Sequence, residues 1–286
     1  MSAKIQYYGV RGSTPVCGKD YLKFGGATTC VAIDCNDHTL IIDAGTGIRQ
    51  LGFDLLQRPE LKSGMHVSIF FTHTHWDHIQ GFPFFIPIYI PQNKFDIYGE
   101  SKAIPINHET KNPKIWTIED TLELQQNFMY FPVATKDLAS SINYHTIKPE
   151  NVYNLYDIEI KTMELKHPNS SMAYRFNFGK SSFVFATDVE HNDEIVAKLI
   201  NFAEGADVLA YDCQYWPDEY LKSKIGWGHS TYEYGSKIAL AAGVKKLHMI
   251  HHDPLHNDAD LEKLEKAAQS KFKETIAIPE GFQFTL

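Results

Sequence analysis

The stretch 67–81 (VSIFFTHTHWDHIQG) constrains this chain most, because a short apolar run passes directly into a cluster of ligand-type side chains. Val67–Phe71 is apolar at four of its five positions, which is typical of a short buried strand. Three histidines and one aspartate follow within six positions: His73, His75, Asp77 and His78. Imidazole and carboxylate groups suit Zn²⁺, and also Mn²⁺ or Fe²⁺. The spacing directs the first two histidines toward one cation, and the aspartate and the last histidine toward a second. The alternative is a histidine cluster on a solvated loop.

Three further ligand-type residues come at the ends of predicted strands. His167 follows Ile158–Leu165, Asp188 follows Ser181–Ala186, and His251 follows 244–250. A surface histidine and a turn-capping aspartate are the alternatives for the first two. The chain mixes strands with helices, and two sheets stacked face to face, with helices outside, would bring such strand ends together along one edge. We therefore expect an α/β sandwich.

Length, charge and cysteine content limit the number of domains and the classes of protein that this chain can belong to. With 286 residues, 43% of them hydrophobic, the chain is long enough for one large core, and we expect a single domain over 1–286. The net charge of −8 excludes a uniformly basic surface for nucleic acid but leaves a local basic patch open. No apolar run reaches 18 residues, so no membrane span is expected. The four cysteines have no zinc-knuckle spacing, which predicts reduced thiols in a cytoplasmic protein.

Local signals predict several other elements. Ser230 and Glu233 form a Ser-x-x-Glu pattern, which predicts a capping box at the start of a helix ending at Ala242. Asp43 is expected to hold loop amides below the cation site without being a ligand. The stretch 102–132 has a weak pattern apart from a helix over Thr117–Gln126, and we expect loops there that shape the substrate mouth. Other helices are predicted over Ile48–Leu56, Asp193–Phe202 and Ala259–Phe272.

Motifs along nearly the whole chain carry a family resemblance, weakest from Lys102 to Asn154. They are GVRGSTP and LIIDAGTG, then HTHWDH, FATD, GHST around His229, and VKKLHMIHHDP. Together they resemble the tRNase Z-like branch of the metallo-β-lactamase superfamily. The similarity is greatest to the cyclic-nucleotide phosphodiesterases of bacteria and phages, of the anti-Pycsar type. The resemblance implies an αββα sandwich of two mixed β-sheets flanked by helices.

The resemblance also implies a dinuclear centre with two divalent cations, zinc first among the candidates and Mn²⁺ or Fe²⁺ as alternatives. The ligands of one cation would be His73, His75 and His167. The ligands of the other would be Asp77, His78 and His251, with Asp188 bridging the two. His251 is preferred to His252 because it comes first after the apolar strand. His229 matches the family's catalytic histidine, which is not a ligand. It could stabilise the phosphate and protonate the leaving oxygen as general acid, and a packed structural histidine is the alternative. Asp77 would orient the hydroxide nucleophile or take its proton.

The implied function is hydrolysis of 3′,5′-cyclic nucleotides to nucleoside monophosphates. The alternatives are a tRNase Z-like endoribonuclease, another hydrolase on this fold, such as one acting on small cyclic phosphates, and a sensor without enzymatic activity. His167 and Asp188 are 21 positions apart, which leaves no room for the long arm of short-form tRNase Z enzymes. Together with the acidic net charge, this spacing predicts that tRNA is not a partner. The resemblance further implies a homodimer.

Overall fold

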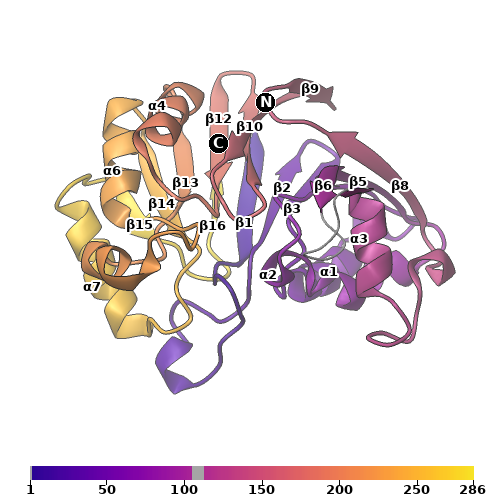
Figure 1. Ribbon diagram of the computed structural model, residues 1–286. Helices are drawn as coiled ribbons and strands as arrows, with labels where there is room; N and C mark the ends of the chain where they lie inside the picture. Colours follow the sequence, from indigo (N-terminus) through magenta and orange to yellow (C-terminus); the bar gives the residue numbers. More distant parts are fainter. Residues whose placement is uncertain (1, 105–112) are drawn as a thin grey trace.

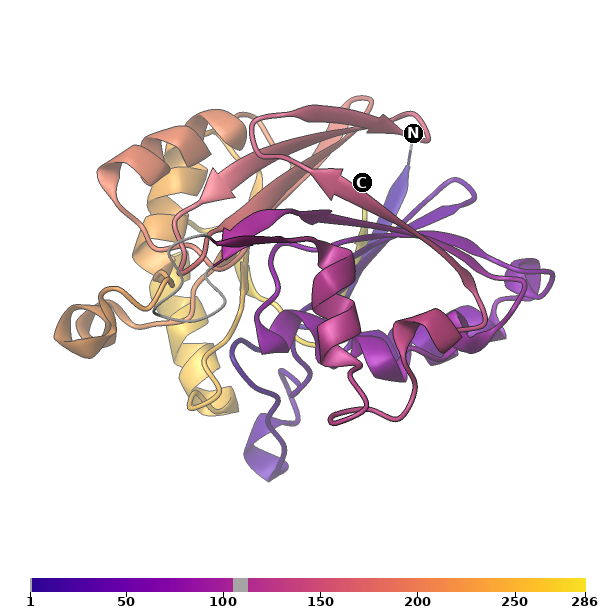
Figure 2. The ribbon, with the colours of Figure 1, turned by 45° about the vertical axis from the view of Figure 1, so that its right-hand side comes forward.

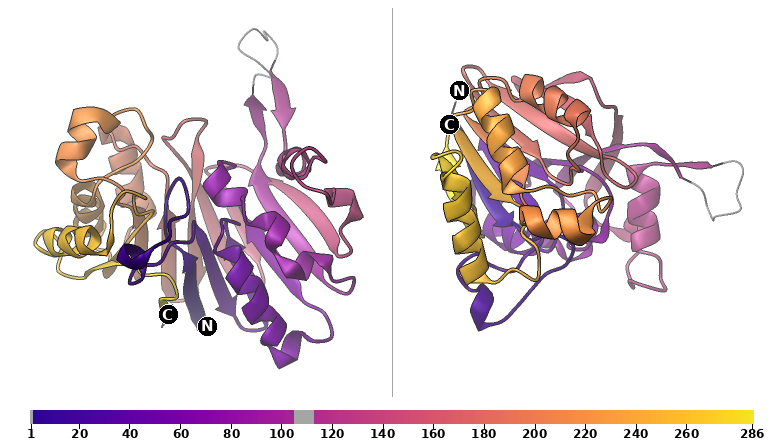
Figure 3. Two further views of the ribbon diagram at one scale, coloured as in Figure 1. Left: turned by 90° about the horizontal axis from the view of Figure 1, so that it is seen from below. Right: turned by 60° about the vertical axis from the view of Figure 1, so that its left-hand side comes forward.

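Two seven-stranded β-sheets form the centre of the computed structural model, which describes residues 2–104 and 113–286 (Figure 1). In spatial order, the first sheet contains β16 (Gln283–Thr285), β1 (Ala3–Gly9), β2 (Cys30–Cys35), β3 (His38–Ile42), β4 (His66–Phe70), β5 (Lys94–Glu100) and β8 (Ser141–Ile147). The second contains β15 (Thr275–Ala277), β14 (Lys246–Ile250), β13 (Val208–Asp212), β12 (Ser181–Ala186), β11 (Ser171–Phe178), β10 (Ile158–Leu165) and β9 (Val152–Leu155). Both sheets are mixed. A separate hairpin of β6 (Lys102–Ile104) and β7 (Lys114–Trp116) projects from the body (Figure 3).

Helices cover the outer face of each sheet, so the layers follow the order αββα. The first sheet carries α1 (Ile48–Gln57), α2 (Trp76–Ile79) and α3 (Ile118–Gln125). The second carries α4 (Asp193–Phe202), α6 (Tyr232–Ala241) and α7 (Asp258–Gln269). A short helix α5 (Pro217–Glu219) continues into a π-helix over Tyr220–Lys224. The predicted sandwich of two mixed sheets between helices is confirmed. None of the helices in the described ranges is long and apolar enough to cross a bilayer.

The space between the two sheets is filled by apolar and aromatic side chains from both. Phe70 of the first sheet meets Tyr174 and Phe176 of the second edge to face, with ring centroids 5.7 and 6.0 Å apart. All three side chains are buried, and such edge-to-face pairs stabilise a core beyond their area burial. Figure 2 shows the second sheet lying over the first. The packing fixes the relative position of the two sheets, and therefore of the loops that leave their edges.

Strand direction decides where the polar loops meet. β12, β13 and β14 pair in parallel, and β10 runs the same way because both β10 and β12 are antiparallel to β11. β3 and β4 of the first sheet are also parallel to each other. The loops that follow the ends of these strands contain the ligand-type residues singled out above.

Most of the helices predicted from local sequence signals are present, but one predicted capping box is not. The helices expected near α1, α3, α4 and α7 are confirmed, and Thr117 caps α3 in a capping box with Asp120. The capping box predicted for Ser230 and Glu233 is wrong, because the N-cap of α6 is Thr231 without a side-chain cap. The Ser230 hydroxyl instead accepts a hydrogen bond from Tyr211.

Three short strands, β6, β7 and β9, were not anticipated. β6 and β7 fall in the stretch 102–132 that was expected to form loops. Residues 105–112 of that stretch lie outside the described part of the chain.

Candidate metal centre

The centre begins with a backbone feature that the strand ends share. Asp43, Asp188 and His251 follow β3, β12 and β14, and their φ angles are 59°, 58° and 62°. A left-handed conformation costs an ordinary residue about 1–2 kcal/mol, so it persists only where the surroundings fix it. All three residues are buried, and they turn sharply out of their strands at the edge where the two sheets meet.

The first cluster consists of two histidines from the loop after β4 and a third from a distant part of the chain. One ligand atom each from His73, His75 and His167 can be chosen so that all lie within 4.8 Å of one another. Nδ1 of His75 lies 3.0 Å from Nε2 of His167. A tetrahedral cation with bonds of about 2.0–2.1 Å holds its ligand atoms about 3.3 Å apart, so this spacing suits one cation.

The second cluster combines two carboxylates with two histidines: Asp77, His78, Asp188 and His251. Asp77 Oδ2 lies 3.2 Å from Nε2 of His78 and 3.2 Å from Nε2 of His251. All four residues are buried. The spacing again suits one cation, now with oxygen as well as nitrogen donors.

Asp188 is part of the second cluster and faces the first through its other oxygen atom. Its Oδ2 lies 3.2 and 3.3 Å from Nε2 of His78 and His251 in the second cluster. Its Oδ1 lies 3.7 Å from Nε2 of both His73 and His167 in the first. One carboxylate thus lies between the two clusters with one oxygen facing each.

The other ring nitrogens of these histidines are held by neighbouring groups. Nδ1 of His78 donates to Asp43, Nδ1 of His167 to the carbonyl of Gly228, and Nδ1 of His251 to the Gln214 side chain, at 2.7–2.9 Å. These bonds leave the Nε2 lone pairs directed into the centre, an arrangement found around metal-ligating histidines.

Two buried nitrogen atoms of the centre have no hydrogen-bond partner in the described ranges. They are Nε2 of His73 and Nε2 of His78. Burying a polar atom without a partner costs about 1–3 kcal/mol. Nε2 of His78 still lies 3.2 Å from carboxylate oxygens of Asp77 and Asp188, so this cost applies chiefly to His73. A cation on each side of Asp188 would give both nitrogen atoms a partner, so the donor set fits two divalent cations.

The charge state differs between the two clusters. Burial lowers the pKa of His73 and His75, and it lowers the pKa of His167 to about 4. In the second cluster burial also opposes protonation, but the nearby carboxylates outweigh it and raise the pKa of His251 to about 9. The first cluster is therefore made of neutral imidazoles ready for ligation, whereas a cation entering the second displaces protons.

His229 lies beside the centre and is held by a carboxylate. Its Nδ1 is 2.9 Å from Oδ2 of Asp212 and 3.9 Å from Oδ1 of Asp188. A carboxylate can only accept, so Nδ1 carries a proton toward Asp212 and Nε2 is the nitrogen left for other work. The amides of Val189 and Gln214 also donate to Asp212 and fix it in place.

The structure thus brings together every residue proposed from the sequence for the centre. His252 points elsewhere, because its Nε2 donates to the carbonyl of Ile278. Sequence reasoning gave Asp212 no role, although it is the last residue of the apolar strand β13, a position similar to that of Asp188 just after β12. Gln214, which holds His251, carried no recognisable signal.

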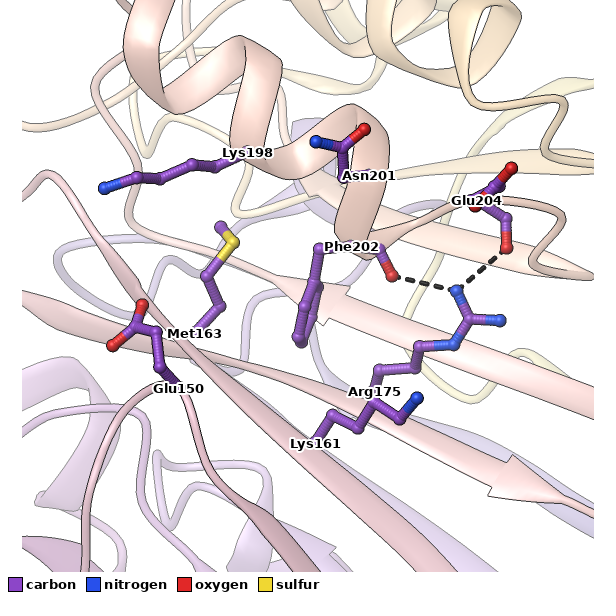
Figure 4. Close-up of a pocket in the computed structure, with 8 residues that line it drawn as sticks. All are labelled: Glu150, Lys161, Met163, Arg175, Lys198, Asn201, Phe202 and Glu204. Carbon is purple, nitrogen blue, oxygen red and sulfur yellow. Dashed lines mark hydrogen bonds between the residues drawn. The ribbon is translucent and has the colours of Figure 1, made fainter.

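A separate hollow of about 570 Å³ borders α4 and is lined by eight residues (Figure 4). Arg175 donates there to the carbonyls of Phe202 and Glu204 at the end of the helix. Besides Arg175 and Glu204, the charged residues that line the hollow are Lys161, Lys198 and Glu150. None of the eight lining residues is a histidine or cysteine. The hollow is therefore not an alternative cation site.

Asp43 offers a test of the support around the ligands. Its Oδ2 accepts from Nδ1 of His78 at 2.8 Å, and its Oδ1 accepts from the amide of Thr72. We expect Asp43→Asn to weaken zinc binding by about 10- to 100-fold in a chelator competition, because the amide orients His78 less firmly. Asparagine tolerates the positive φ at this position, which limits backbone effects.

Asp96→Asn is the matched control for this variant. Asp96 also contacts two histidines, His66 and His145, but these lie outside both clusters. Zinc affinity should stay unchanged in the control. Equal weakening in both variants would show a general loss of stability.

Comparisons with known proteins agree with this geometry. The sequence model described as a beta-lactamase superfamily domain matches residues 38–252. A protein named Ribonuclease Z from Picrophilus torridus is 22% identical, and the alignment covers 99% of this chain and 96% of that protein. The metallo-beta-lactamase fold protein YhfI from Bacillus subtilis superposes with a TM-score of 0.72 at 20% identity, covering 100% of this chain and 99% of the other. A diphosphatase from the PhnP family gives 0.69 at 16% identity, covering 100% and 98%.

The prediction that tRNA is not a partner is contradicted by these relatives. A protein named Ribonuclease Z aligns with almost the entire chain. The short β11–β12 hairpin between His167 and Asp188 shows only that no long arm is inserted there. Net charge is an average over the surface, whereas nucleic-acid binding depends on the local potential. Neither observation excludes an RNA substrate.

Proposed function

This chain belongs to the beta-lactamase superfamily. We propose that it is a tRNase Z-like member of that superfamily, a two-cation phosphodiesterase that hydrolyses 3′,5′-cyclic nucleotides to nucleoside monophosphates. The metal-dependent hydrolase class follows from the family. The cyclic-nucleotide substrate is the finer part of the proposal. We assign the cation ligands to His73, His75 and His167 on one side and Asp77, His78 and His251 on the other. Asp188 would bridge the two.

The buried pair of His229 and Asp212 is the observation that carries the proposal. A phosphodiester with an alkoxide leaving group needs a proton donor at the departing oxygen. Asp212 accepts from Nδ1 of His229 at 2.9 Å and fixes the orientation of the ring, so Nε2 is the nitrogen free to deliver that proton. His229 is also buried, which limits competition from bulk water. This support favours phosphodiester over carbonyl substrates.

Asp77 has the second chemical role. When bound, two divalent cations lower the pKa of a water and neutralise charge on the phosphoryl oxygens. Asp77 lies among the ligands, and its Oδ2 accepts from the backbone amide of Ser13 at 2.8 Å. We assign it to orient the attacking water and accept its proton. Water then attacks phosphorus, one ring P–O bond breaks, and His229 protonates the leaving oxygen.

RNA cleavage is the second candidate, and a specific observation favours it. The relative that aligns with 99% of this chain is named Ribonuclease Z. The same pair of His229 and Asp212 could protonate the leaving oxygen of an RNA strand. The two candidates share the centre and differ in what surrounds the reacting phosphate.

A substrate panel tests the proposed function. We expect the zinc-loaded protein to convert cyclic mononucleotides to nucleoside monophosphates, with slower turnover of cyclic dinucleotides and of precursor tRNA. The products should be identified by chromatography. Cleavage of precursor tRNA without turnover of any cyclic nucleotide would transfer the assignment to the second candidate.

The protein should bind two divalent cations per chain. The reason is that each oxygen of Asp188 faces its own histidine cluster. Elemental analysis after saturation with zinc and removal of excess should give a ratio near two. A ratio of one would contradict the dinuclear assignment.

The homodimer expected from the resemblance stays a prediction, for which sedimentation is the measurement.

A further inference from the structure

We propose that the exposed indole of Trp227 is the nucleobase subsite of this centre, and that Lys224 is the residue that positions the indole. This inference rests on the proposed function, because it supplies the part of the site that binds the nucleoside. It assigns a stacking surface, which accepts any base, and no hydrogen-bonding pattern that selects one.

The backbone around Trp227 is fixed by a buried carboxylate. Gly226 and Gly228 have φ angles of 88° and 87°, and their amides donate to Glu190 at 2.6 and 2.9 Å. The amide of Trp227 itself donates to the carbonyl of Lys224 at 3.1 Å. The indole nevertheless stays 56% exposed. A large apolar ring on a fixed loop loses little conformational freedom when it binds a flat partner.

The loop that holds this indole packs directly on the centre. The carbonyl of Gly228 accepts from Nδ1 of His167 at 2.7 Å. A Cβ atom on Gly228 would lie 2.2 Å from the same nitrogen, so only glycine fits. His229 is the next residue along the chain. Trp227 is therefore one position from a residue in contact with a proposed ligand and two positions from the proposed general acid.

Lys224 connects the indole to the ring next to the general acid. Its ammonium lies 4.0 Å from the ring centroid of Trp227 and 5.2 Å from that of Tyr215. The Tyr215 ring in turn lies 5.9 Å from the ring of His229. In the described ranges no carboxylate comes within ion-pair distance of Lys224, so its interactions here are with the two rings. Lys224 ends a π-helix, a rare element that is frequent at functional sites.

The chemistry of these groups suits a nucleotide whose phosphate lies at the cations. Stacking of a base on an aromatic side chain is tolerant of base identity, because every base has a π-face. A cation on one face of the indole holds the ring by cation–π attraction. We assign the exposed surface of the indole that Lys224 does not cover to the base. Inorganic phosphate would reach the cations without touching the indole, and this difference defines the test.

The test compares binding of 5′-AMP and of inorganic phosphate to the zinc-loaded protein by calorimetry. Trp227→Ala should weaken 5′-AMP by about 10-fold and change phosphate by less than about 2-fold. Trp227→Phe keeps a ring and should stay within about 3-fold of the parent for both ligands. Zinc content should remain near that of the parent in each variant, because the indole is exposed and is not a proposed ligand.

Lys224 has its own variants and a matched control. Lys224→Ala should weaken 5′-AMP by about 3-fold, because the indole is less well held, and Lys224→Arg should restore the parent affinity. Lys222→Ala, on the same π-helix with no ring contact in the described ranges, should change nothing.

Several outcomes would overturn the subsite. Unchanged 5′-AMP affinity in Trp227→Ala, equal weakening of 5′-AMP and phosphate, or a loss in Trp227→Phe as large as in alanine would each contradict base stacking. A selective loss of 5′-AMP affinity in a protein that hydrolyses no cyclic nucleotide would leave the subsite standing. It would instead contradict the proposed substrate.

Discussion

Replacing Asp188 with alanine should remove most of the bound cation from both clusters at once. Its Oδ1 faces His73 and His167, and its Oδ2 faces His78 and His251, so one carboxylate serves both sides. The variant should also lose at least about 10³-fold in turnover, because the cations supply several kcal/mol of transition-state stabilisation. Elemental analysis and the rate on bis-p-nitrophenyl phosphate measure the two effects.

Two further variants test whether the cation loss in Asp188→Ala comes from the lost bridge or from another effect of the substitution. His73→Ala removes a ligand from the first cluster only and should leave about one cation per chain. Asp188→Asn keeps a residue that tolerates a φ of 58°, so it tests the lost charge with little backbone strain. Loss of a single cation in Asp188→Ala would contradict the bridging role.

The sandwich could be predicted because the proposed cation ligands come shortly after apolar runs that are typical of strands. Val67–Phe71 before His73 and Ser181–Ala186 before Asp188 are local signals that need no knowledge of distant contacts. The two-sheet arrangement follows, since strand ends carrying ligands must meet. The strands that were missed, such as β9 at a sheet edge, are too short for a periodic pattern.

The residues that support the centre could not be predicted in the same way. Asp212 and His229 are separated by a short helix and a π-helix, and only the folded chain brings them to 2.9 Å. Ser230 shows the opposite failure. Its sequence pattern is that of a helix cap, but its hydroxyl is already engaged by Tyr211 and His191. A local sequence pattern predicts which hydrogen bonds a side chain can form, but the tertiary contacts determine which of them it does form.

His229→Ala should separate proton delivery from cation binding. His229 is outside the proposed ligand set, so cation content should remain near two per chain. Turnover of a cyclic nucleotide should fall by about 10²-fold or more, because its alkoxide leaving group departs slowly without a proton donor. Turnover of bis-p-nitrophenyl phosphate should fall less, since p-nitrophenolate leaves without protonation. The ratio of the two losses is the measurement.

Asp212→Asn extends the same argument to the carboxylate behind the histidine. An amide can present its N–H or its oxygen to Nδ1, so it no longer fixes which nitrogen of His229 carries the proton. The loss should follow the pattern of His229→Ala, with the cyclic nucleotide more affected than the p-nitrophenyl diester.

Equal losses on both substrates in His229→Ala would limit His229 to holding the phosphate. No loss on either would make it a structural residue, and the proton would then have to come from water.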